Sequence, residues 1–343
     1  MRNNNKQASS RASLEHCRSA TVHRAGKCVC ALCAAGAFGL TVPASADEGG
    51  VSLWLPGQFG SLAAVPTTPG WELGAFYYHG SVSAGGDRSF PISGKIAAGV
   101  DGRANMIFLA PTYTFAEPVL SGQAGVSVAW AFGRMSATAD VSITGPLGRS
   151  LSASETDSIF GGSDLYPMGT LKWNSGKNNW MLYLMGDIPT GAYRLGRLAN
   201  VGINHGAIDG GGGYTYLDQE KGHEFSIVAG ITYNFENNDT HYQNGVDSHI
   251  DWGMSQFLSE SSLIGLVGYY FYQLTGDSGS GATLGDFKSR VGGIGPQAGY
   301  FFPFAGQKAF VGVKAYWEFD AVHRPEGWNF WLELAIPLGG PPK

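Results

Sequence analysis

The feature that most constrains this chain is a repeated alternation between apolar and polar residues. The clearest example is KAFVGVKAYWEFDA, residues 308–321. Successive side chains of a β-strand point to opposite faces, so this stretch predicts a strand between an apolar and a polar environment. The polar row carries Lys314, Glu318 and Asp320. The apolar row comprises Ala309, Val311, Val313, Ala315, Trp317 and Phe319.

The same alternation recurs along most of the chain. These stretches are about 10 to 13 residues long, whereas strands of soluble sheets usually have ~5–6 residues and a tilted membrane crossing needs ~9–11. The final example, GWNFWLELAIPL, places Trp328, Leu332 and Leu334 in one row. The others cover residues 71–80, 105–115, 122–133, 178–188, 223–236, 249–258, 263–276 and 290–302.

Two further features distinguish a membrane barrel from a soluble sandwich. The apolar rows often begin or end in aromatic residues, as the interfacial girdles of a barrel require. The opposite rows are rich in Gly, Ser, Thr and single charges, which suit a watery lumen better than a dry core. The chain has 13% aromatic and 14% charged residues, with a mean hydropathy of −0.06. We therefore expect an all-β fold, a transmembrane antiparallel β-barrel, over residues 71–343.

The strand count is eleven or twelve, because residues 123–145 form either one long strand or two. Single-chain outer-membrane barrels have even strand numbers, so we expect about twelve. Polar, Gly-rich segments at 83–104, 146–163 and 191–222 predict extracellular loops. Within the last of them, IDGGGGY (208–214) has the composition of a flexible linker.

The final two strands also allow a prediction of register. A short turn through residues 322–325 makes the numbers of facing residues sum to 647. Lys314 then lies opposite Glu333 and Tyr316 opposite Trp331, all in the lumen. On the outside, Trp317 meets Phe330 and Phe319 meets Trp328.

The N-terminus predicts a signal peptide over residues 1–46. Basic residues precede the apolar run 28–40, and Ala44-Ser45-Ala46 forms a cleavage site. Removal takes away all four cysteines, six Lys/Arg and one Glu, and leaves 16 basic and 26 acidic side chains, a net charge of −10. This balance argues against nucleic-acid binding.

Residues 47–70 lie between the signal and the first clear strand, and two interpretations stay open. The prolines and glycines of this segment interrupt any long strand or helix, which favours an extended periplasmic lead-in. Alternatively, the segment folds into the lumen as a plug. The side chains that would then line a solute path are Trp54, Leu55, Gln58 and Phe59.

Several motifs together resemble a known family. WLPGQFG (54–60), GDIPTG (186–191), GYYFYQLTGDSG (268–279) and GIGPQAGYFFP (293–303) occur in an order similar to that of outer-membrane proteins linked to the meta-pathway of phenol degradation. The resemblance covers nearly all of the predicted mature chain. It implies a barrel that passes hydrophobic substrates inward, and it implies no residue-level ligand site.

The C-terminus departs from the usual pattern of such barrels. Their last residue is usually an aromatic one that the outer-membrane insertion machinery recognises. This chain ends in AIPLGGPPK, with Leu338 as its last outward apolar residue.

The sequence offers little support for catalysis, a metal or any other cofactor. GDSG (276–279) matches the string around a serine-protease nucleophile, yet it follows an aromatic strand and predicts a turn around Ser278. The histidines lack metal-ligand spacing and are interpreted as single surface residues. Residues 234–251 lack the spacing of a calcium loop, which favours a solvated turn.

The leading hypothesis is an outer-membrane barrel channel for passive uptake of small hydrophobic, chiefly aromatic, compounds. Its partners would be the lipid bilayer, these solutes and the insertion machinery. The alternatives are a structural or partner-binding barrel without transport, and a soluble exported sandwich. The expected lumen-facing residues are Lys314, Glu333, Tyr316, Trp331, Glu318, Tyr269 and Phe271.

Overall fold

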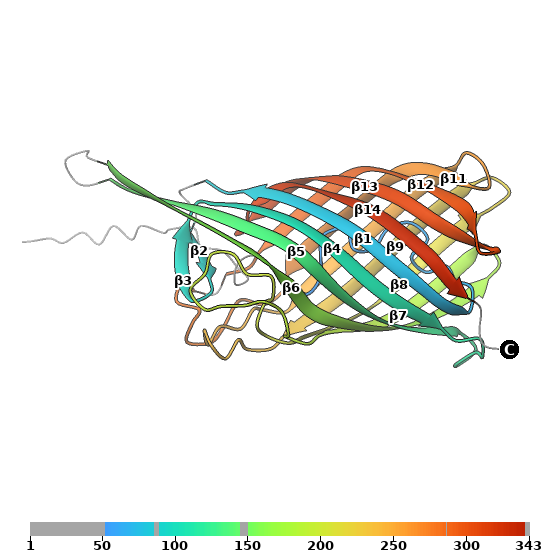
Figure 1. The fold of residues 1–343 in the computed structure, drawn as a ribbon, viewed down its shortest axis with the longest axis horizontal. Helices are drawn as coiled ribbons and strands as arrows, with labels where there is room; N and C mark the ends of the chain where they lie inside the picture. Colours follow the sequence, from blue (N-terminus) through green and yellow to red (C-terminus); the bar gives the residue numbers. More distant parts are fainter. Residues whose placement is uncertain (1–51, 86–88, 145–149, 286, 340–343) are drawn as a thin grey trace, which may run out of the picture. The chain divides into compact units, whose positions relative to one another are not determined.

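Twelve long strands form one closed antiparallel barrel (Figure 1). The computed structural model describes residues 52–85, 89–144, 150–285 and 287–339, so the predicted signal peptide lies outside the described residues. The barrel strands are β1 (Gly70–Ser83), β4 (Val100–Thr114), β5 (Gln123–Thr144), β6 (Ser150–Ser175), β7 (Asn178–Asp187), β8 (Ala207–Asp218), β9 (His223–Asn234), β10 (Asp247–Phe257), β11 (Ser262–Gln273), β12 (Arg290–Phe304), β13 (Gln307–Val322) and β14 (Glu326–Gly339).

The predicted fold class is confirmed. Residues 123–144 form the single strand β5, which resolves the strand count to an even number. A separate hairpin of β2 (Ser89–Ile92) and β3 (Lys95–Ala98) lies in the connection between β1 and β4. Within the described residues, no helix is long and apolar enough to cross a membrane.

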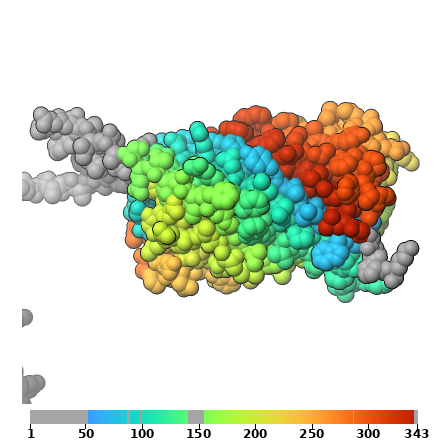
Figure 2. Space-filling view, in the orientation of Figure 1, coloured from blue at the N-terminus to red at the C-terminus, as the bar shows by residue number. Residues whose placement is uncertain are grey.

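The barrel closes where its first and last strands meet. β1 pairs with β4 on one side and with β14 on the other, each time along almost its whole length. In Figure 2 the red surface of β13 and β14 directly adjoins the blue surface of β1. Closure leaves no sheet edge unpaired, as a sheet surrounded by lipid requires.

The two ends of the barrel differ in the length of their connections. One end carries the start of β1, the end of β14 and short turns such as 176–177 and 305–306. We call it the short-turn end. The opposite end carries the longer connections 188–206, 235–246 and 274–289 together with the β2–β3 hairpin. We call it the long-loop end.

The outer face of the barrel is an apolar belt. Trp317 on β13 is 58% exposed although its strand neighbours Tyr316 and Lys314 are buried. Aromatic pairs lie toward both ends of the strands, such as Trp71 with Tyr113, whose ring centroids are 5.1 Å apart. Exposure of such a belt suits lipid contact and contradicts the soluble sandwich. Other exposed members of the belt are Val126, Leu182, Leu184, Ile231, Ile250, Ile264, Ile294, Val313, Trp328 and Leu332.

All three predicted loops were partly wrong, and the third, 191–222, contains the whole of β8. Residues 150–163 belong to β6, which pairs with β5 as far as Ser150 and Thr144. The pair extends beyond the other strands at the long-loop end (Figure 1). In the same way the predicted loop 83–104 contains β2, β3 and the start of β4. Polar composition suggested loops here because strands outside the lipid need no apolar row.

The Gly-rich run 208–214 is not a flexible linker. It is the middle of β8, and every residue of the run pairs with both β7 and β9. A Cβ on Gly211 would lie 2.1 Å from the Ala229 carbonyl oxygen and 2.8 Å from the Tyr183 ring. The glycines therefore allow close backbone packing beneath the Tyr183 side chain, a role that composition does not reveal.

The predicted register of the last hairpin was wrong by two residues. Lys314 pairs with Trp331 and Tyr316 with Asn329, so facing numbers sum to 645. The turn is wider than expected, since the ladder between β13 and β14 ends at Trp317 and Trp328. Within the turn, the Gly327 N–H donates to the Glu318 carboxylate at 2.8 Å. An even shift preserves which side chains face the lumen.

Candidate functional site

The lumen-facing side chains expected on β11, β13 and β14 all lie on the inner face of the barrel. Five of them are buried, namely Lys314, Tyr316, Trp331, Tyr269 and Phe271. Glu318 and Glu333 are half-buried. Lys314 Nζ forms an ion pair with Glu333 Oε1 at 2.6 Å despite the shifted register. The Tyr269 hydroxyl donates to Glu318 Oε1 at 2.9 Å.

The lumen also contains the chain segment 52–66, which we call the lumen segment. It hydrogen-bonds to inward side chains from opposite sides of the barrel. Lys314 of β13 donates to the Gly57 carbonyl at 2.9 Å, and Lys172 of β6 donates to the Val65 carbonyl at 3.2 Å. A segment bound by side chains from strands around a closed ring lies inside it, as the blue trace in Figure 1 shows.

Trp54 is the most buried large side chain of the lumen segment, at 2% exposure. Its indole N–H donates to Asp251 Oδ2 of β10 at 2.9 Å. The indole stacks on His249, with ring centroids 5.0 Å apart, and on Phe271 at 5.8 Å. Trp54 therefore joins the segment to β10 and β11 through both polar and apolar contacts.

His249 is held between two carboxylates beneath Trp54. Its Nδ1 lies 3.0 Å from Asp251 Oδ2, and its Nε2 lies 3.3 Å from Asp209 Oδ2. All three side chains are fully buried. The interpretation of single surface histidines was thus wrong for His249, and also for His205, which is 4% exposed.

The other candidates of the lumen segment also contact the wall. Phe59 lies against Tyr183, with ring centroids 5.1 Å apart, and the Gln58 amide contacts Met185 Sδ at 3.3 Å. Leu55 packs against the cluster around Trp54. Gly57 has a φ of +81°, and a Cβ there would lie 2.6 Å from the Tyr316 ring. Only glycine fits this position without displacing Tyr316.

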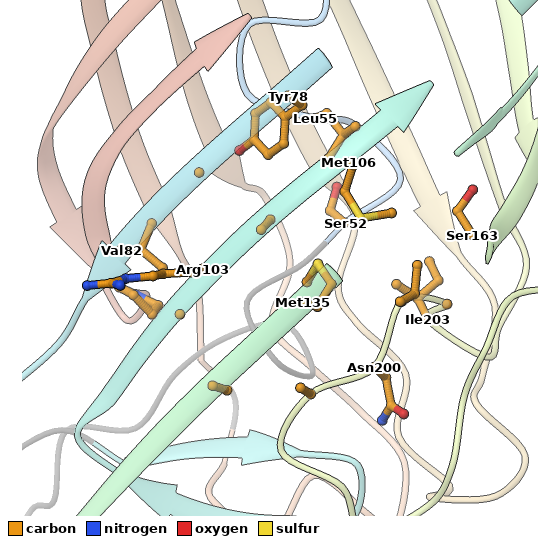
Figure 3. Close-up of a pocket in the computed structure, with 18 of the residues that line it drawn as sticks. Ser52, Leu55, Tyr78, Val82, Arg103, Met106, Met135, Ser163, Asn200 and Ile203 are labelled. Carbon is orange, nitrogen blue, oxygen red and sulfur yellow. The ribbon is translucent and has the colours of Figure 1, made fainter. Parts of the chain in front are cut away.

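An apolar cavity of about 240 Å³ lies between the lumen segment and the long-loop end. Figure 3 shows Leu55, Tyr78, Met106 and Met135 around it, with Ile203 on its far side. An apolar cavity of about 150 Å³ is enough to bind benzene. This one therefore has room for a substituted aromatic ring. Further apolar lining comes from Leu53, Pro56, Ile92, Val100, Phe108, Leu198 and Val201.

The connection 188–206 forms the far wall of this cavity and is anchored to β6. Asp164 accepts hydrogen bonds from the backbone N–H groups of Gly191 and Ile203 at 2.7 and 2.8 Å. Arg197 forms a bidentate pair with Asp157. Burial lowers the pKa of His205, which therefore favours its neutral form in this wall.

A second opening of about 600 Å³ lies at the short-turn end, where the lumen segment leaves the barrel. Its lining is polar and includes Asn174, Lys177 and Glu220 together with Pro66. Residues 52–56 of the lumen segment line the apolar cavity, and Val65 and Pro66 of the same segment line this opening. Among the described residues, no group of three or more His, Cys, Asp or Glu side chains is arranged to hold a metal ion.

Several lumen residues escaped the sequence reasoning. His249 and Asp251 are alternate residues of one strand, as are Tyr78 and Phe76, so the period-2 pattern could have placed each pair on one face. Arg324 lies in a turn, where no periodicity applies, and no sequence signal could have placed it at the cavity.

The fold is shared with a solved outer-membrane channel. An outer membrane channel from Pseudomonas putida F1 is 14% identical, with a TM-score of 0.63 over 82% of this chain and 99% of that one. A FadL homologue from Pseudomonas aeruginosa is 10% identical, with a TM-score of 0.40 over 87% of this chain and 98% of that one. No curated protein sequence matches this chain significantly. Because the family model described as "Putative MetA-pathway of phenol degradation" matches residues 85–334, more than half of the chain, the chain belongs to that family.

Proposed function

We propose that this chain is a bacterial outer-membrane channel for passive uptake of small hydrophobic, chiefly aromatic, compounds. The observation that carries the proposal is an apolar cavity of about 240 Å³ inside a barrel whose outer face is an apolar belt. The family description refers to phenol degradation, and the similar barrel from Pseudomonas putida F1 is described as an outer membrane channel. Both fit a channel that supplies aromatic compounds.

Orientation follows from the connections. Outer-membrane barrels have short periplasmic turns and longer extracellular loops. The long-loop end then faces the outside, and the apolar cavity is the first site that an entering solute meets. Export through a signal peptide over residues 1–46, removed afterwards, would bring the chain to the insertion machinery.

The lumen segment acts as a plug in this proposal. Its contacts through Trp54, Gly57 and Val65 separate the apolar cavity from the polar opening at the short-turn end. A solute that has bound in the cavity passes when the segment moves aside. Passive diffusion requires neither catalysis nor a cofactor, and we propose neither.

Uptake measurements test the proposal. A strain that lacks the gene should accumulate radiolabelled phenol more slowly than the parent at low external concentration, and the gene should restore the rate. A matched variant, Ala137→Trp, fills the cavity from β5 and should restore less, whereas Val126→Trp on the outer face of the same strand should restore fully. Equal uptake in all strains would refute a transport role.

A structural or partner-binding barrel remains a second candidate because the middle of the lumen is packed and ion-paired. Lys314 with Glu333, and His249 with Asp209 and Asp251, fix the lumen segment in place. A permanently closed barrel would show no solute flux in proteoliposomes, even with residues 52–60 deleted. Faster swelling of the deletion variant would favour the channel.

A further inference from the structure

The apolar cavity adjoins one arginine that has no hydrogen-bond acceptor among the described residues. Two arginines adjoin the cavity, Arg103 and Arg324. Arg103 is exposed and shares its row of β4 with the outward Ile107, and in Figure 3 it points away from the other labelled side chains. Arg324 comes from the β13–β14 connection and is half-buried. It is therefore the arginine that faces the cavity.

Arg324 lies on the aromatic stack that contains Trp54. Its guanidinium carbon is 5.1 Å from the centroid of the Phe271 ring, and Phe271 in turn stacks on Trp54. The Arg324 Nε is buried and has no hydrogen-bond partner. Within the described part of the chain, no group accepts a hydrogen bond from this guanidinium. Burying this Nε–H donor without an acceptor is costly.

Glu318 supplies negative charge at the same cavity without bonding to Arg324. Its two oxygens already accept hydrogen bonds from the Tyr269 hydroxyl and the Gly327 N–H. The guanidinium therefore lacks a hydrogen-bond acceptor although a carboxylate lies at the same cavity. An anionic solute would be repelled by Glu318.

Tyr78 supplies a second polar group at the same cavity. Its ring lies edge-on to Trp331, with centroids 4.8 Å apart, and covers Gly80. Its hydroxyl makes no hydrogen bond within the described residues. The cavity thus combines apolar walls with two unused groups that can donate hydrogen bonds.

We infer that Arg324 and Tyr78 recognise the oxygen substituent of an uncharged aromatic solute, whose ring occupies the apolar part of the cavity. The site then discriminates in two directions. It favours an aromatic alcohol over the corresponding hydrocarbon, which leaves the donors unpaired, and over the corresponding carboxylate, which meets Glu318. The inference rests on the proposed function and specifies the class of solute.

Calorimetric titration of the full mature chain in lipid nanodiscs tests the inference, with empty nanodiscs as the reference. The probes are benzyl alcohol, toluene and benzoate. Benzyl alcohol should bind about 10- to 100-fold more tightly than toluene, as expected for one hydrogen bond from a charged donor. Arg324→Met should reduce the preference for benzyl alcohol over toluene to the share of Tyr78, about 2- to 10-fold, and leave toluene affinity unchanged.

Two further variants control the experiment. Arg103→Met removes the outward arginine beside the same cavity and should leave all three affinities unchanged. Tyr78→Phe keeps the ring against Trp331 and should weaken benzyl alcohol binding about 2- to 10-fold, so the inference stays testable if Arg324→Met fails to fold. Heat-modifiable migration of the barrel on SDS gels verifies folding of each variant.

Three results would overturn the inference. The first is equal affinity for toluene and benzyl alcohol in the unmodified protein, and the second is a preference for benzyl alcohol that Arg324→Met leaves undiminished. The third is tightest binding of benzoate, which would indicate an anion site. Uptake of radiolabelled phenol is measured separately. Uptake without the preference for benzyl alcohol would reject this inference alone, whereas a lack of uptake would reject the channel itself.

Discussion

Replacement of Trp54 by alanine should open the barrel if the lumen segment is a plug. Trp54 is almost completely buried and contributes both a ring stack and an N–H donor to the lumen wall. No other side chain of the segment combines these contacts. Its truncation is therefore the most direct test of whether the segment holds the lumen closed.

The magnitude follows from the burial of the indole. Truncation of a buried tryptophan costs roughly 3–5 kcal/mol. The lower value applies here because Trp54 also lines the cavity, so the space left behind joins an existing void that water can enter. At about 1.4 kcal/mol per factor of ten, ~3 kcal/mol shifts the ratio of closed to open states roughly 100-fold.

Trp54→Phe separates the two contributions. Phenylalanine retains most of the stack on His249 and Phe271 but leaves Asp251 without the indole N–H. Loss of a hydrogen bond to a charged group costs about 1.5–3 kcal/mol, which corresponds to a shift of roughly 10- to 100-fold. The effect of Trp54→Phe should therefore lie between those of the wild type and Trp54→Ala.

Planar lipid bilayer recordings measure the fraction of time in the open state. Trp317→Ala is the matched control, because Trp317 is 58% exposed on the outer face and does not touch the lumen segment. Open fractions should rise in the order wild type and Trp317→Ala, Trp54→Phe, Trp54→Ala. If Trp54→Ala conducts no more than Trp317→Ala, the lumen segment does not control opening.

The remaining predictions concern the anchors of the lumen segment and of the cavity wall. Gly57→Ala should raise the open fraction more than Gly306→Ala. Both glycines have a similar positive φ, but only at Gly57 would the added Cβ lie 2.6 Å from a ring, that of Tyr316. Equal effects of the two variants would exclude the clash with Tyr316 as the cause. Lys314→Met should lower the urea midpoint of unfolding, because removing one partner of a buried ion pair costs roughly 3–5 kcal/mol. The cost is lower here, since Glu333 is 18% exposed. The double variant Lys314→Met with Glu333→Gln should recover part of the lost stability, and no recovery would contradict the ion-pair argument. Burial depresses the folded-state pKa of His205, so its contribution to stability is complete above about pH 6.5 and is lost as the pH falls below that value. The protection factor of the Ile203 amide, which corrects for the slower intrinsic exchange in acid, should therefore fall as the pH drops through this range, and His205→Asn should remove this dependence.

The sequence predicted the barrel well because one physical constraint acts on every lipid-facing strand. Alternation marks Val313, Trp317 and Leu332 as outward residues, and all three are exposed. The constraint weakens where the strands leave the lipid, which explains why β6 before residue 164 was assigned to a loop. The alternation is also weak at residues 208–214, because glycines have no side chains that could form an apolar or a polar row.

Prediction of the lumen was limited for a different reason. The alternation of side chains along a strand places Lys314 and Trp331 on the inner face, but it does not show which groups fill the lumen in front of them. The register error at the last hairpin came from the assumption of a short turn, whereas the ladder between β13 and β14 already ends at Trp317 and Trp328. Which strand residues contact Trp54 depends on the curvature of the whole barrel. The contacts of Trp54 with His249 and Asp251 could therefore not be predicted from the sequence.

Trp54 links the two proposals, because it belongs both to the closed lumen and to the solute cavity. Its indole is bound to Asp251 on one side, and its stack with Phe271 lies beneath the Arg324 guanidinium on the other. A solute oxygen that accepts a hydrogen bond from Arg324 would compete with the cation–π contact between Arg324 and Phe271. A solute can favour the open state only by the difference between its affinities for the two states. The cavity can therefore promote opening only for solutes that Arg324 binds more strongly once Trp54 has moved away.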